Sequence, residues 1–168
     1  MAVRPIVRYP EASLKRPSEP FAGHPDSVGE ALIRDLLDTM RVSPATVGLA
    51  APQIGVGIRA FVLDVSGHRR ATTAQGLVGL LDPVLISWDG GETVREGCLS
   101  VPDLTANVRR ATTIEIEGRT TRGETRRYRM EGFEARAALH ELDHLDGLLI
   151  LDRVASAGEI FARKVYGG

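Results

Sequence analysis

Cysteine is almost absent from this sequence, and its scarcity limits how the chain can be stabilised. Cys98 is the only cysteine among 168 residues. A single cysteine cannot form an intrachain disulfide, which fits a reducing compartment. A lone cysteine is usually a small buried residue, so any chemical role for Cys98 needs a separate argument.

Long apolar runs and an excess of charge are also missing. No stretch approaches the length needed to span a bilayer, and the N-terminus has no continuous hydrophobic core of the signal-peptide kind. We therefore expect a cytoplasmic protein with no membrane partner. The net charge of -1 argues against strong binding to nucleic acid. The arginines of segment 122–129 are interspersed with Glu124 and Thr125 and predict a solvated strand face.

The chain length fits a single domain over residues 1–168 with a sizeable core, and no repeat or linker divides it. Five of the nine prolines fall before residue 26 and predict an extended arm. The expected anchors of this arm are Ile6, Val7, Tyr9 and Leu14.

A helix is expected from Ser27, because Glu30 follows at the spacing of a capping box. Apolar residues then repeat every four positions up to Met40, and Ser43 and Pro44 end the pattern. Apolar or alternating segments predict strands at 59–65, one or two strands within 77–88, a strand at 112–117 with its hairpin partner at 125–130, and a core strand at 148–151. The tail from 155 to 168 is expected to hold one or two helical turns at most.

Strands outnumber helices in this interpretation, and short turns link most of them. We predict an α+β fold in which antiparallel β-sheets pack around a central helix that carries the motif described next.

The segment L-H-E-L-D-H-L-D-G, residues 139–147, has the H-E-x-x-H spacing in His140, Glu141 and His144. On a helix, residues four apart lie one turn apart on nearly the same face, so both imidazoles can hold one metal ion. Gly132 and Phe133 are expected to begin this helix, and Gly147 suits its C-terminal cap.

Glu141 lies round the helix from the histidine pair, where it can reach a water molecule on the metal better than the metal itself. This is the arrangement of metal-assisted hydrolysis, in which the metal lowers the pKa of water and the carboxylate moves the proton. Asp143 lies on the other side with a shorter side chain, and we expect it to orient a ligand or a neighbour.

Cys98 stands in the segment E-G-C-L-S, 140 - 98 = 42 residues before His140. A thiolate is a strong ligand for transition metals and binds deprotonated. One thiolate with two imidazoles makes a three-ligand set with an open fourth position, as in catalytic sites.

The segment V-G-L-A-A-P-Q-I-G-V-G, residues 47–57, predicts a tight backbone that something approaches closely. Gln53 is its one side chain with directional hydrogen-bond donors, although a glycine-rich turn with a surface glutamine remains an alternative. The spacing and lysine of a phosphate loop are absent. His68, in a polar segment, is expected to be solvated.

Three blocks stand in order, G-L-A-A-P-Q-I-G at 48–55, E-G-C-L-S at 96–100 and H-E-L-D-H-L-D-G at 140–147. Together they resemble the peptide deformylase family over nearly the whole chain. The resemblance implies an enzyme that removes the formyl group from the N-terminal methionine of new polypeptides and releases formate. The implied substrates are N-formyl-methionyl peptides and nascent chains, met at the ribosome.

The resemblance also implies roles for individual residues. Cys98, His140 and His144 would hold one divalent ion, with ferrous iron typical and zinc, nickel or cobalt able to replace it. Glu141 would be the general acid and base, and Gln53 with the backbone N–H of Leu99 would stabilise the oxyanion. An apolar pocket for the methionine side chain would be lined by Val47, Val94, Phe133 and Ala137. Gly48 and Gly97 would offer backbone hydrogen bonds to the peptide.

Two rival functions stay open. H-E-x-x-H also occurs in zinc metalloproteases. Their third ligand, a His or Glu, usually follows the motif, and here Glu159 is the only His or Glu after it. The second rival is a paralogue of low activity that binds formylated N-termini. Its support is Thr46 and Leu139, where the family often has glycine and glutamine; Asp82 also replaces the usual asparagine before proline.

Overall fold

The structure, a computed structural model, describes residues 2–164 and is built from two antiparallel sheets around a helix. The larger sheet has the order β1-β2-β3-β6-β7, with bounds Gly48–Ala50, Ala60–Leu63, Val78–Asp89, Thr113–Arg119 and Thr125–Glu131. The smaller sheet has the order β4-β5-β8, with bounds Glu92–Cys98, Val101–Arg110 and Ile160–Ala162. The helices are α1, Asp26–Val42, and α2, Gly132–Leu145. Short 3-10 turns cover Ala12–Lys15, Ala51–Ile54, Ile150–Asp152 and Ala157–Glu159.

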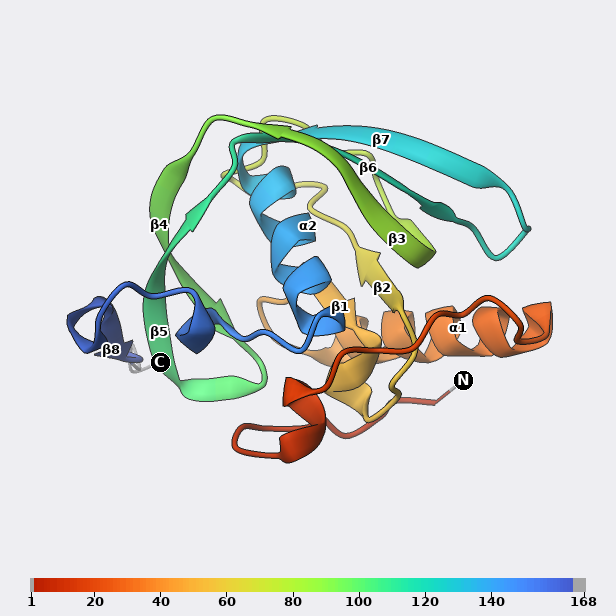
Figure 1. Ribbon diagram of the computed structural model, residues 1–168, viewed down its shortest axis with the longest axis horizontal. Helices are drawn as coiled ribbons and strands as arrows, with labels where there is room; N and C mark the ends of the chain where they lie inside the picture. Colours follow the sequence, from red (N-terminus) through yellow and green to blue (C-terminus); the bar gives the residue numbers. More distant parts are fainter. Residues whose placement is uncertain (1, 165–168) are drawn as a thin grey trace.

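Helix α2 lies in the middle of the molecule, with the long strands β3, β6 and β7 on one side of it and β4 and β5 on another (Figure 1). Apolar side chains of α2 and of the larger sheet form one core, including Phe61, Leu80, Ile116 and Leu145. The predicted α+β fold around the motif helix is therefore confirmed.

Strands β6 and β7 form the predicted hairpin, in register from Thr113↔Glu131 to Arg119↔Thr125. Its arginines face solvent, and Arg127 bonds to Glu117 across the pair. This confirms the predicted solvated face.

A single strand, β3, covers the segment for which one or two strands were expected. Asp82 has a φ of 48°, and the pairing with β6 shifts register between Leu81 and Val84. Aspartate tolerates this left-handed backbone better than most residues. Its carboxylate accepts the N–H groups of Phe21 and Ala22 at 2.6 and 3.0 Å, which fixes the N-terminal arm to the bulge.

Several expectations from the sequence were wrong. Helix α1 begins at Asp26 after Pro25, and no side chain caps it, so Ser27 and Glu30 form no capping box. Tyr9 is 50% exposed and is not an anchor of the arm, whereas Leu14 is fully buried.

Segment 148–151 is not a strand. Leu149 and Ile150 are buried, but the backbone forms a 3-10 turn in which the Leu149 N–H donates to Asp152. Part of the C-terminal tail is a strand, β8, which extends the smaller sheet; residues 165–168 lie outside the described part of the chain.

Candidate metal centre

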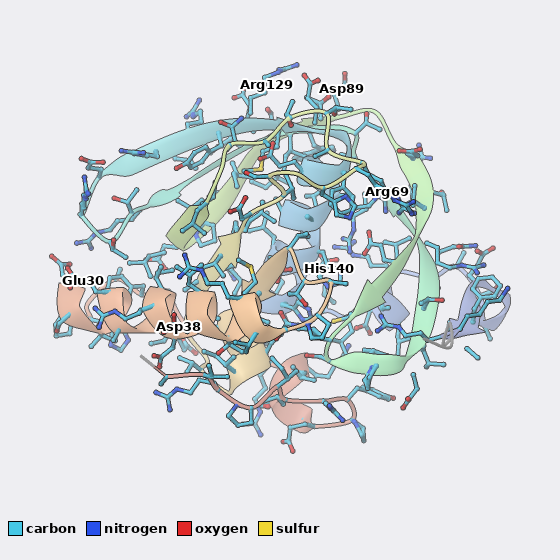
Figure 2. The ribbon with its side chains drawn as sticks, turned by 180° about the vertical axis from the view of Figure 1, so that it is seen from behind. Glu30, Asp38, Arg69, Asp89, Arg129 and His140 are labelled. Atoms are coloured by element: carbon cyan, nitrogen blue, oxygen red, sulfur yellow. The ribbon has the colours of Figure 1, made fainter. Side chains whose placement is uncertain are left out.

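Helix α2 holds the two histidines as the spacing predicts. His140 and His144 stand one turn apart with ring centroids 5.0 Å apart, and His144 is buried. In Figure 2, His140 is seen between α1 and the strands of the smaller sheet. The helix begins at Gly132 and Phe133, as expected.

Cys98 reaches this pair from the end of β4. Alternate residues of a strand point to opposite faces, so β4 buries Glu96 and Cys98 while Arg95 and Gly97 face outward. The Cys98 sulfur lies 3.3 Å from Nε2 of His144. Folding therefore closes the 42-residue gap and places the thiol beside both imidazoles.

The donor atoms fit a single metal ion. One atom each from Cys98, His140 and His144 lies within 4.8 Å of the others. Two ligands bound to one zinc-like ion at tetrahedral angles would lie about 3.6 Å apart, close to the observed sulfur–nitrogen separation. Burial tends to raise the pKa of Cys98, but the neighbouring histidines hold it well below its ordinary value. A thiolate with two imidazole nitrogens suits zinc, iron and related transition metals.

A buried ionic network fixes the orientation of His140, and the sequence interpretation missed it. Nδ1 of His140 donates to Glu96 Oε2 at 3.0 Å, which leaves Nε2 for a metal. Glu96 also accepts two bonds from Arg110, at 2.8 and 2.9 Å, and one from Arg136 at 2.7 Å. Burial alone would raise the pKa of Glu96, but the bonds from Arg110 and His140 lower it overall. The carboxylate stays ionised and holds the imidazole in one orientation. Glu96 stands in E-G-C-L-S, which is the signal that could have found it.

Asp143 joins the same network from the next turn of α2. Arg110 donates to it at 2.6 Å, and Arg153 donates from the segment after the helix. Asp143 is thus bonded to the arginine that holds Glu96, which agrees with the orienting role expected of it.

Glu141 is buried beside the donor cluster and packs against Gly48 of β1. A Cβ at Gly48 would lie only 2.6 Å from Glu141 Oε1, so glycine is what lets the carboxylate reach its place. Oε2 of Glu141 is buried without a hydrogen-bond partner among the described residues. Burial raises the pKa of Glu141 to about 6, with an opposing effect from the two histidines. A carboxyl with this pKa can both take and release a proton near neutral pH.

Gln53 is fixed with its amide nitrogen toward the cluster. Its Oε1 accepts the N–H of Ala50 at 3.0 Å, and its Nε2 donates to Ser100 Oγ at 3.3 Å and lies 3.7 Å from the Cys98 sulfur. Gln53 is 2% exposed, so the alternative of a surface glutamine was wrong.

A cavity of about 370 Å³ opens over the cluster. Its walls include the donors Cys98 and His140 and most of the residues expected from the sequence: Val47, Gly48, Gln53, Gly97, Leu99, Phe133, Ala137 and Glu141. Val94 was expected in the pocket but is absent from its lining. The sequence interpretation missed four lining arginines, namely Arg70, Arg95, Arg136 and Arg163.

His68 was expected to be solvated, but its ring stacks on Phe133 with centroids 4.1 Å apart. His68 is half-buried and does not line the cavity itself, but it packs behind Phe133, which does.

Comparison with known proteins decides the family. The family model described as polypeptide deformylase matches residues 3–159. The chain belongs to the peptide deformylase family. A peptide deformylase of Pelotomaculum thermopropionicum is 36% identical over 98% of this chain and 99% of its own. Another, from Halothermothrix orenii, is 43% identical over 77% of this chain and 79% of its own.

Solved peptide deformylases share the fold. The Legionella pneumophila enzyme has a TM-score of 0.82 at 33% identity, over 92% of this chain and 87% of its own. A class I type b peptide deformylase of Acinetobacter baumannii, solved with Met-Ala-Ser bound, has a TM-score of 0.81 at 29% identity. The match covers 91% of this chain and 99% of that chain.

This deformylase is therefore a hydrolase that takes the formyl group from polypeptides, and it has a site able to hold a metal. Within residues 2–164, neither helix is long and apolar enough to cross a membrane.

Proposed function

We propose that this enzyme removes the formyl group from the N-terminal formyl-methionine of newly made polypeptides in the cytoplasm and releases formate. The proposal treats residues 1–168 as one catalytic domain. The observation that carries it is the cluster of Cys98, His140 and His144 with the buried Glu141 beside it, where Cys98, His140 and Glu141 line one cavity.

In this proposal Cys98, His140 and His144 hold one divalent ion, and we assign ferrous iron, with zinc, nickel or cobalt as substitutes. When bound, the ion supplies Lewis acidity, which polarises the formyl carbonyl and lowers the pKa of a water molecule. Glu96 keeps the His140 ring turned so that Nε2 faces the site.

Glu141 moves the protons. Its unpartnered oxygen takes a proton from the attacking water, and the same carboxyl delivers it to the departing amine. A raised pKa supports both steps, because Glu141 is still mostly ionised at neutral pH and can accept a proton, while its protonated form lies closer to neutral pH than that of an ordinary carboxyl and can donate one.

Two donors stabilise the negative charge that develops on the formyl oxygen. The Gln53 amide, fixed by its bond from Ala50, and the backbone N–H of Leu99 serve as these donors. Donors fixed before the reaction stabilise a transition state without reorganisation, and one such donor is worth about 10²–10³ in kcat.

The methionine side chain enters the apolar part of the cavity, between Val47, Phe133 and Ala137, and the backbones of Gly48 and Gly97 bond to the peptide. The Met-Ala-Ser bound to the Acinetobacter baumannii enzyme supports a peptide that begins with methionine as the ligand of this cavity, because that peptide is what remains of formyl-Met-Ala-Ser after deformylation.

The test is formate release from formyl-Met-Ala-Ser by protein loaded with Fe(II) or Ni(II). The assay is run under anaerobic conditions, since an Fe(II)-thiolate that lines an open cavity invites oxidation of Cys98. We expect stoichiometric formate and Met-Ala-Ser. Cleavage of internal peptide bonds without formate would favour a metalloprotease. One tightly bound metal with no turnover would favour a binding paralogue.

A further inference from the structure

Three of the arginines that line the cavity have no acidic partner within residues 2–164. Arg70, Arg95 and Arg163 form no ion pair in this part of the chain. The fourth, Arg136, is buried and bonded to Glu96. The three unpaired guanidinium groups therefore keep their charge available at the mouth of the cavity.

Strand geometry brings two of these arginines to one face. Arg95 and Gly97 share the outward face of β4, because residues two apart in a strand point the same way. Gly97 pairs with Thr105 of β5, which pairs with Phe161 of β8. The Arg95 guanidinium lies 3.6 Å from the centroid of the Phe161 ring, a cation–π contact that holds it in place.

Arg163 directly follows β8, and its side chain lies over β4. Its backbone N–H donates to Asp103 at 2.9 Å, which continues the pairing with β5. A Cβ at Gly97 would collide with Nη2 of Arg163, so the guanidinium lies directly over the Gly97 backbone. Arg70 reaches the cavity from the loop between β2 and β3.

Carboxylates in the cavity do not cancel this charge. Glu96 and Glu141 are the acidic residues among its lining, and both are buried. Glu96 is already bonded to two arginines and a histidine. A peptide that runs past Gly97 would pass under Arg163 and beside Arg95 after its first side chain has entered the pocket.

We propose that Arg95 and Arg163, helped by Arg70, make this enzyme prefer peptides with an acidic residue at the second or third position after the formyl group. The inference rests on the proposed function and deepens it by naming a substrate class. Partly exposed ion pairs are individually weak, so we expect a preference of about threefold to tenfold in kcat/KM. The preference falls with added salt, because the screening length is about 8 Å at 0.15 M.

The experiment compares matched peptides that differ by one charge. Formyl-Met-Ala-Asp-amide is compared with formyl-Met-Ala-Asn-amide, and formyl-Met-Asp-Ala-amide with formyl-Met-Asn-Ala-amide, at 20 mM and 500 mM salt. The measured quantity is the acidic-to-neutral ratio of kcat/KM for the wild type and for R95Q, R163Q and R70Q. R163E adds a charge reversal, tested with formyl-Met-Ala-Lys-amide.

Arg122→Gln is the matched control. Arg122 is exposed in the turn between β6 and β7, on the opposite side of the molecule from β4 and β8 (Figure 1). The substitution removes the same charge at a distance from the cavity, and we expect the wild-type ratio.

The proposal predicts that R95Q and R163Q bring the ratio toward one and that R163E improves the lysine peptide relative to the wild type. Equal rates for acidic and neutral peptides in the wild type would overturn the inference and leave the proposed function standing. A preference that survives all three glutamine variants would also overturn it. No formate from any of the peptides would overturn the proposed function and the inference together.

Discussion

Replacement of Gly48 by alanine should disable Glu141 without removing the metal ligands. The new methyl group would lie 2.6 Å from Oε1 of Glu141 and 3.1 Å from its Cδ and Cγ, where ordinary contacts begin at 3.4 Å. The carboxylate must withdraw by about 0.8 Å, and a misplacement of about 1 Å can cost 10²-fold in rate. We therefore expect kcat to fall about 10- to 100-fold. The backbone N–H and C=O of residue 48, which we propose bind the peptide, are kept.

The assay measures kcat for formate release beside the metal content of the purified protein and its unfolding in urea. Overpacking of a tight site costs about 1–3 kcal/mol, so the variant should remain folded and hold about one metal ion per chain. Gly57→Ala is the matched control, because its Cβ would meet nothing within 4 Å and its backbone has no positive φ. Gly48→Ala with kcat within twofold of the wild type would refute the placement of Glu141.

Three further substitutions test the ionic network of the site and the packing and ion pairs of the fold around it. Glu96→Gln should destabilise the protein by about 3–5 kcal/mol in urea unfolding, because it leaves Arg110 and Arg136 buried with one carboxylate fewer; a loss under 1 kcal/mol would contradict this. Gly29→Ala should lower stability by about 1–3 kcal/mol, since its Cβ would meet Leu81 at 2.7 Å and Phe21 at 2.9 Å; an unchanged urea midpoint would count against this packing. Burial tends to raise the pKa of Asp152, but Lys15 and the Leu149 N–H lower it overall, so its stabilisation is present above the unfolded pKa of about 3.9 and is lost as pH falls through the lower folded value. Asp152→Asn should thus be less stable than the wild type at pH 6, with the difference shrinking below pH 4 in acid titrations of unfolding; a pH-independent difference would exclude this linkage.

Local patterns predicted the helix of the site but not the network that supports it. The H-E-x-x-H spacing places His140 and His144 together whatever surrounds the helix. Glu96 finds Arg110 and Arg136 only after folding, at separations of 14 and 40 residues. Partners so far apart in the sequence belong to no local pattern, so the sequence does not identify which arginine pairs with which acid.

Errors in the fold have similar physical causes. Leu149 and Ile150 are buried, as an apolar run requires, but burial alone does not supply a strand with a pairing partner. Strand β8 has three residues, too few for a periodic signal, and exists because the edge of β5 accepts it. The arginines at the cavity mouth were missed because two of them depend on that pairing for their position.

The most direct test measures metal content and formate release together for the wild type, Glu141→Ala and Cys98→Ala. The account predicts about one metal ion and rapid turnover in the wild type, one metal ion and almost no formate for Glu141→Ala, and neither for Cys98→Ala. Full turnover by Glu141→Ala, or tight binding of a metal ion by Cys98→Ala, would contradict it.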